Sequence, residues 1–153
     1  MNYHEAVIVD FARRTRANLD FVEAAKGRGE NVFEVTQLAN SLLGLLVFPQ
    51  QRYMNSIPDT PLAELVNQGW PKIQTTSGAL PEENLHQLLR MLRNSIAPCN
   101  VEFMAESEGL ITGIKVWNTK SGKKTWQAEL SLDDLRTIVM KFIELIESDK
   151  VSG

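Results

Sequence analysis

Residues 88–100 of this chain read LLRMLRNSIAPCN and predict an amphipathic helix that carries a basic edge and stops at a proline. On a wheel of about 100° per residue, the apolar residues make one stripe that should face the core: Leu85, Leu88, Leu89, Leu92 and Ile96. His86, Arg90 and Arg93 cluster on the flank of that stripe. The helix should open at Pro81-Glu82-Glu83, because a proline and acidic residues suit a first helical turn, and run to about Ala97.

The composition is typical of one globular domain, which we expect over residues 1–153. The chain is 43% apolar and 23% charged, with a net charge of −3 and a pI near 5.4, so any RNA contact must use a local basic patch. The single cysteine, Cys99, cannot form an internal disulfide, which fits a reducing compartment. The N-terminal residues do not resemble a secretion signal and no apolar run could span a bilayer, so we expect a cytoplasmic protein without a membrane partner.

Three further helices are indicated by periodicity. Over residues 4–25, apolar residues recur with the helical period. Residues 33–48 are too apolar on every side for a surface helix and should form the buried central helix. Residues 49–80 hold four of the six prolines and predict an irregular connection with one short helix over 61–67.

The C-terminal third alternates apolar with polar residues and then returns to a helical pattern. Residues 101–105, 110–117 and 125–130 are separated by Glu108-Gly109 and Ser121-Gly122 turn signals, which predicts three antiparallel strands. Ser131-Leu132-Asp133-Asp134 should cap and start the last helix. The expected fold class is mainly α: a helical bundle with a small three-stranded antiparallel sheet before the C-terminal helix.

Three segments together resemble a bacterial and plasmid-borne branch of the HEPN family. They are Arg14-Thr15 with Asn18-Leu19, the run FEVTQLANSLLGL at 33–45, and Arg93-Asn94-Ser95-Ile96-Ala97. The second is the most specific, because a long apolar helix does not need that order of polar residues to pack. The resemblance implies a HEPN-like bundle, a homodimer formed through the motif helices, and metal-independent RNA cleavage by proteins that often act as toxins or antiphage elements.

The resemblance also assigns the candidate catalytic positions. Arg93 and Asn94 match the start of the family's motif, and Pro98 stands where the motif has its histidine. A histidine titrates near neutrality and can move the protons of RNA cleavage, whereas arginine can only stabilise the phosphate charge. Proline can do neither transfer. His86 and Arg90 are candidate RNA-binding residues on the same helix edge.

Each of these candidate residues also has a purely structural interpretation. Arg93 and Asn94 are, without the resemblance, polar residues on a solvated helix edge, and His86 is a surface histidine. Basic residues also occur in the first helix, at Arg13, Arg14 and Arg16, and beside Trp117 and Trp126, at Lys115, Lys120, Lys123 and Lys124; they can bind single-stranded nucleic acid or merely solubilise a sheet. Residues 121–125 lack the full phosphate-loop pattern, and Cys99 has no histidine nearby in sequence.

The functional hypothesis is a HEPN-type ribonuclease-like protein that is catalytically inactive as written, because its active site is degenerate at Pro98. We expect the Arg93 edge, lined by Leu89, Leu92 and Ile96, to lie at a two-fold interface, with RNA and an antitoxin protein as further candidate partners. No cofactor is implied, and no metal site is expected because no cluster has metal-ligand spacing. The alternative is a non-catalytic RNA-binding or protein-interaction module on the same dimeric bundle.

Overall fold

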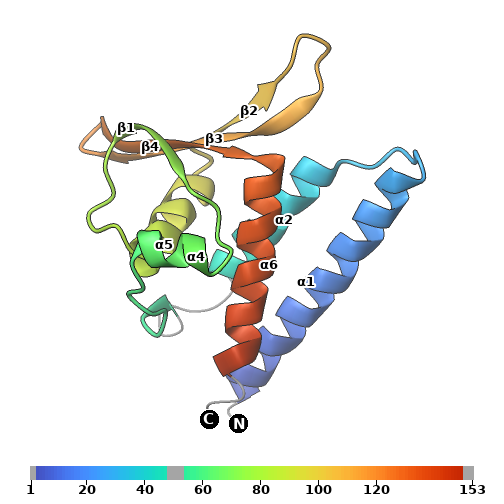
Figure 1. Cartoon of the computed structure of the whole chain (residues 1–153), viewed down its shortest axis with the longest axis horizontal. Helices are drawn as coiled ribbons and strands as arrows, with labels where there is room; N and C mark the ends of the chain where they lie inside the picture. The colour runs from blue at the N-terminus through green and yellow to red at the C-terminus, as the bar shows by residue number, and fades with distance from the viewer. Residues whose placement is uncertain (1–2, 48–53, 150–153) are drawn as a thin grey trace.

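The computed structural model describes residues 3–47 and 54–149 and shows helices capped at one end by a sheet (Figure 1). The helices are α1 (Tyr3–Gly27), α2 (Glu34–Val47), α4 (Leu62–Asn67), α5 (Leu85–Ile96) and α6 (Leu132–Asp149). The strands are β1 (Gln74–Gly78), β2 (Val101–Ala105), β3 (Ile111–Lys120) and β4 (Lys123–Ser131). The described part of the chain is therefore mixed α and β, and the expectation of a mainly α protein is only partly right.

Helix α2 is the central element, as its apolar sequence predicts. It contacts α1 and α6 on one side, α5 on another, and β3 at the sheet. Its side chains Val35, Leu38, Leu42, Leu45 and Leu46 are all buried in one continuous core. Phe48, the predicted last residue of this helix, lies outside the described residues.

The sheet has four antiparallel strands in the order β1-β4-β3-β2, so the prediction of three strands was wrong by one. The three predicted strands are present, and their inner face buries Ile114, Val116, Trp126, Ala128 and Leu130 above the helices. The missed strand is β1, whose five residues are all exposed. It lacks the apolar alternation that marks a strand, and it is held by pairing with β4 rather than by burial.

The start of α5 also differs from the prediction. Residues 81–83 are not helical; Asn84 is the N-cap, and its side chain accepts a hydrogen bond from the Gln87 amide at 2.9 Å. The segment just before the helix pairs with the start of α4: the Leu62 amide donates to the Glu83 carbonyl and the Leu85 amide to the Thr60 carbonyl. This long-range pairing satisfies backbone groups that a helical turn at Pro81 would have used.

The last helix begins as predicted. The Ser131 hydroxyl accepts a hydrogen bond from the Asp134 amide at 3.1 Å, and the Asp134 carboxylate accepts one from the Ser131 amide at 2.9 Å. This reciprocal pair is a capping box with aspartate in place of glutamate. It ends β4 and starts α6 without a linker, so the sheet and the helix bundle are rigidly joined.

Candidate functional site

Helix α5 presents the predicted basic edge to solvent. Its stripe of Leu85, Leu88, Leu89, Leu92 and Ile96 is buried, as predicted. Arg90 is exposed, and His86, Arg93 and Asn94 are half-buried on the remaining surface. Because residues three and four apart share a helix face, His86, Arg90 and Arg93 form one row, which we call the α5 edge.

The burial of the leucines corrects one expectation. Leu89, Leu92 and Ile96 are 0%, 0% and 8% exposed within a single copy of the chain. They pack against the protein's own core and cannot line an interface with a second copy unless the fold opens. Any two-fold contact along this helix must therefore use the polar α5 edge and the turn that follows it.

A buried polar network fixes α5 against the sheet. The Asn118 side-chain amide, on the inner face of β3, donates to the Met91 carbonyl at 2.8 Å and to the Ser95 hydroxyl at 2.6 Å. The Ser95 hydroxyl in turn donates to the Met91 carbonyl at 2.8 Å. Ser95 is fully buried and Asn118 nearly so. These bonds set the depth and rotation of the helix, and hence where Arg93 and Asn94 point.

The end of α5 places Pro98 in a tight turn. The Cys99 amide donates to the Ile96 carbonyl at 3.0 Å and the Asn100 amide to the Ser95 carbonyl at 2.8 Å, with Cys99 at a φ of 65°. This pair of bonds is a Schellman motif, the usual way for a chain to leave a helix. Pro98 is exposed within it. A proline is tolerated here because it follows the last residue of the regular helix.

Geometry separates the two candidate catalytic positions within one copy. On a continuous helix, five residues correspond to a rotation of about 140°, and Pro98 lies beyond the end of α5, so the helix does not place position 98 on the side that carries Arg93. His86 lies two turns before Arg93, about 10 Å along the axis. Its Nδ1 is 3.7 Å from a carboxylate oxygen of the exposed Asp59. One copy of α5 does not by itself bring a histidine and Arg93 together.

The segment that contains α5 carries no negative side chain of its own. Residues 84–101 contain none of the 19 acidic residues of the chain. The basic turn of α1 differs. The Arg14 Nε lies 2.7 Å from an Asp10 oxygen, Arg13 binds the other oxygen, and Arg16 pairs with Glu147 at 3.3 Å. Hydrogen bonds from Arg14 and then Arg13 hold the pKa of Asp10 below its ordinary value. The α1 arginines are thus partly neutralised.

Comparison with known proteins confirms the family resemblance. The family model described as HEPN pEK499 p136 matches residues 1–152. The chain belongs to this HEPN family. No curated protein and no solved structure matches it.

Two further findings describe this HEPN protein. Among residues 3–47 and 54–149, no group of three or more His, Cys, Asp or Glu side chains is arranged to hold a metal ion. None of the helices in the same ranges is long and apolar enough to cross a membrane.

Some residues that matter to the site carry no clear sequence signal. Asn118 and Ser95 are single polar residues within otherwise apolar patterns, yet the hydrogen bond between their side chains joins α5 to β3. Asp59 lies 27 residues before its partner His86. Strand alternation offers a clue to Asn118. It is a polar residue at an inward-facing position of the strand, after Val116 and before the turn, and a buried polar side chain needs a hydrogen-bond partner.

Proposed function

We propose that this HEPN protein is an RNA-binding relative of the family's metal-independent ribonucleases, and that it does not cleave RNA as written. The observation that carries the proposal is the α5 edge, where Arg90 and Arg93 lie on a helix that has no acidic residue of its own and that leads into a turn with Pro98 at the motif's histidine position. Arginines on one helix face can bind successive phosphates of an RNA strand.

The chemistry explains why the proline matters. RNA supplies its own nucleophile, the 2′-hydroxyl, so the protein must accept a proton, return one to the leaving oxygen and stabilise the charged phosphate. Arg93 can supply the stabilising charge. Asn94 can donate a hydrogen bond to a phosphate oxygen. Pro98 has no titratable group, and His86 is two helical turns from Arg93, so neither replaces the missing acid and base.

Dimerisation completes the proposed site. HEPN domains commonly form dimers, and within one copy α5 does not place position 98 on the side that carries Arg93. Two copies related by a two-fold axis along the α5 edge would bring position 98 of one copy towards Arg93 of the other. Since the leucines of α5 are buried, we expect this contact to be polar and to be strengthened by bound RNA.

The cellular role follows from the same reading. A HEPN ribonuclease that acts as a toxin or antiphage element harms its host when it is active, and we propose an antitoxin protein as the partner of the active form. One base change converts a histidine codon into a proline codon, and we propose that Pro98 arose as such an inactivating substitution. The alternative is the non-catalytic module: its protein-interaction form predicts no affinity for RNA, and its RNA-binding form predicts affinity for RNA without cleavage by Pro98→His.

The test compares three purified proteins on a single-stranded RNA in chelator: the chain as written, Pro98→His, and Pro98→His combined with Arg93→Ala. We expect cleavage only by Pro98→His, together with slowed growth of cells that express it. Circular dichroism and the melting temperature serve as the folding control. Equal growth and no cleavage from well-folded Pro98→His protein would refute the ribonuclease ancestry of the site.

A further inference from the structure

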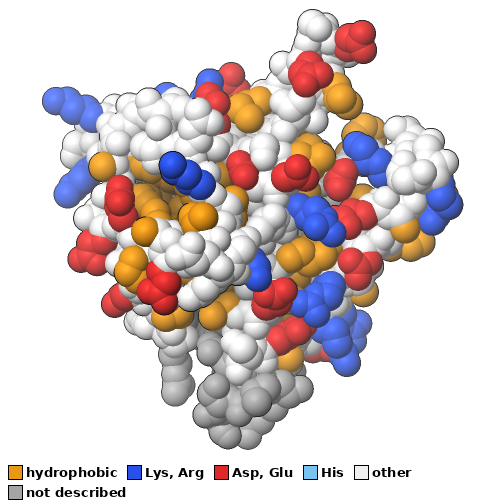
Figure 2. All heavy atoms as spheres, in the orientation of Figure 1, with side chains coloured by type: hydrophobic (Ala, Val, Ile, Leu, Met, Phe, Trp, Pro, Cys, Tyr) orange, Lys and Arg blue, Asp and Glu red, His pale blue; other side chains and the backbone are white. Residues whose placement is uncertain are grey.

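The hairpin of β3 and β4 carries a second basic surface. Residues 109–128 contain no acidic residue, although the chain as a whole is acidic. Figure 2 shows Lys and Arg side chains standing at the left edge of the molecule, over the turn between β3 and β4, whereas basic and acidic side chains alternate over α1 and α6. The hairpin is therefore a local positive patch on a protein of net charge −3.

The turn holds its lysines close together. Lys120 and Lys123 are paired across the two strands, and the two residues between them both have positive φ, 52° at Ser121 and 76° at Gly122. A two-residue turn of this kind is tight and matches the twist of the strands. Lys120, Lys123 and Lys124 are all exposed, and no described residue forms an ion pair with any of the three.

An aromatic ring lies beside these lysines on the outer face of the sheet. Trp117 is half-buried and pairs directly with Gln127 of β4. The Lys124 ammonium lies 4.9 Å from the centre of the Trp117 ring and donates to the Gln127 side chain at 2.8 Å. Trp70 and Trp126, by contrast, are 8% and 1% exposed. Trp117 is the tryptophan that a ligand can reach.

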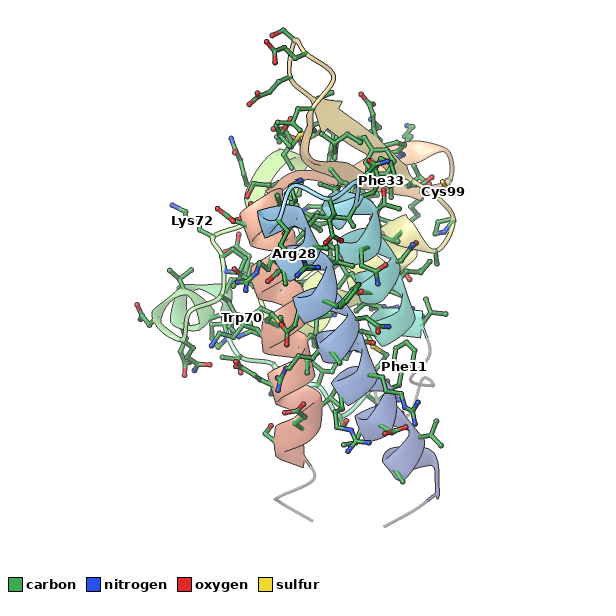
Figure 3. All side chains as sticks on the ribbon, turned by 90° about the vertical axis from the view of Figure 1, so that its right-hand side faces the viewer. Phe11, Arg28, Phe33, Trp70, Lys72 and Cys99 are labelled. Atoms are coloured by element: carbon green, nitrogen blue, oxygen red, sulfur yellow. The ribbon has the colours of Figure 1, made fainter. Side chains whose placement is uncertain are left out.

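The hairpin adjoins the end of α5. The Trp117 amide donates to the Asn100 carbonyl at 3.2 Å, and Asn100 closes the turn that contains Pro98. Figure 3 shows Cys99 in this turn, on the opposite side of the molecule from Lys72. The two acid-free segments, 84–101 and 109–128, thus meet at Trp117. Lys115 is excluded from the patch because it pairs across the strands with Glu102 and Glu129.

We propose that Trp117, Lys120, Lys123 and Lys124 form a binding site for single-stranded RNA on the outer face of the sheet, next to the turn that follows α5. A base stacks on the Trp117 ring in place of the Lys124 ammonium, which moves to the adjoining phosphate, while Lys120 and Lys123 hold the next phosphates. Only a single strand can offer a base face to the ring, because duplex bases are stacked on one another. That the ligand is RNA rests on the proposed function; the site itself rests on the hairpin geometry.

The experiment titrates the full chain with a 12-nucleotide polyuridine and follows tryptophan fluorescence and anisotropy of labelled RNA. We expect quenching in the wild type and none in Trp117→Phe, because the other two tryptophans are buried. Trp117→Ala should weaken binding roughly tenfold, the loss of one base stack. Lys123→Gln should lower the slope of log affinity against log salt by about 0.7. The matched control, Lys72→Gln, removes an exposed lysine on the far side and should change neither.

The outcomes separate the two proposals. If Arg93→Ala weakens binding while Trp117→Ala and Lys123→Gln leave it unchanged, the hairpin site is refuted and the α5 site stands. If the hairpin variants weaken binding and Arg93→Ala does not, the hairpin site stands without the proposed function. Equal affinity for a duplex of the same length would overturn the stacking argument. Trp117→Phe and Lys123→Gln keep the test valid even if Trp117→Ala fails to fold.

Discussion

Replacing Asn118 by alanine should loosen the helix on which the candidate site is built. The substitution removes hydrogen bonds of 2.8 Å to the Met91 carbonyl and 2.6 Å to the Ser95 hydroxyl, and it leaves space under β3. Each buried hydrogen bond contributes about 1 kcal/mol, and the vacated space adds to the loss. We therefore expect the free energy of unfolding to fall by about 2–3 kcal/mol, which for a chain of this size lowers the melting temperature by about 4–12 °C.

Urea denaturation followed by circular dichroism measures this loss, with an unchanged m-value as the sign that the unfolded state is not altered. Thr119→Ala is the matched control, since Thr119 is the next residue of β3 and is exposed; its effect should stay within about 0.5 kcal/mol. Ser95→Ala should cost about 1–2 kcal/mol, because it removes the two bonds of the Ser95 hydroxyl while Asn118 keeps its bond to Met91. The double variant should cost less than the two single losses combined. An Asn118→Ala loss below about 0.5 kcal/mol would refute the role of this network.

Three further predictions test other parts of the structure. Ser131→Ala removes the cap of α6 and should lower the free energy of unfolding by about 1 kcal/mol; a free energy of unfolding equal to that of the wild type would contradict the capping role. Gly113→Ala should destabilise by about 1–3 kcal/mol, because an added Cβ would lie 2.2 Å from the Leu130 carbonyl oxygen; a calorimetric melting temperature equal to the wild type would be unexpected. Light scattering at tens of micromolar should detect a dimer that Arg93→Glu weakens, and a strict monomer with RNA present would count against the two-chain site.

The helical part of the fold is readable from sequence because its burial is periodic. Leu85, Leu88, Leu89 and Leu92 repeat with the helical period, and each is at most 2% exposed. Strand β1 is not readable in this way. Its residues are polar and exposed, and its place in the sheet depends on pairing with β4, about 50 residues later. The same kind of distant pairing moves the start of α5 from Pro81 to Leu85.

Only part of the candidate site is likewise predictable from the sequence. The row of His86, Arg90 and Arg93 follows from helical spacing alone, and its exposure depends on the leucines beside it. That Asn118 holds this helix, and that Trp117 lies next to the turn after it, depends on contacts between segments about 20 residues apart. The leucine stripe itself was assigned to the wrong contact: an apolar stripe predicts burial without saying whether the partner is the same chain or another, and Leu89, Leu92 and Ile96 pack in their own core.

The most direct test of the account measures the affinity of the chain as written for a single-stranded RNA, with Arg93→Ala beside Arg28→Ala. Both substitutions remove one positive charge, but Arg28 follows the end of α1 and does not lie on α5. We predict that Arg93→Ala weakens binding severalfold and reduces its salt dependence, while Arg28→Ala does neither. Equal affinities for the two variants and the wild type would contradict the claim that this HEPN protein binds RNA through α5.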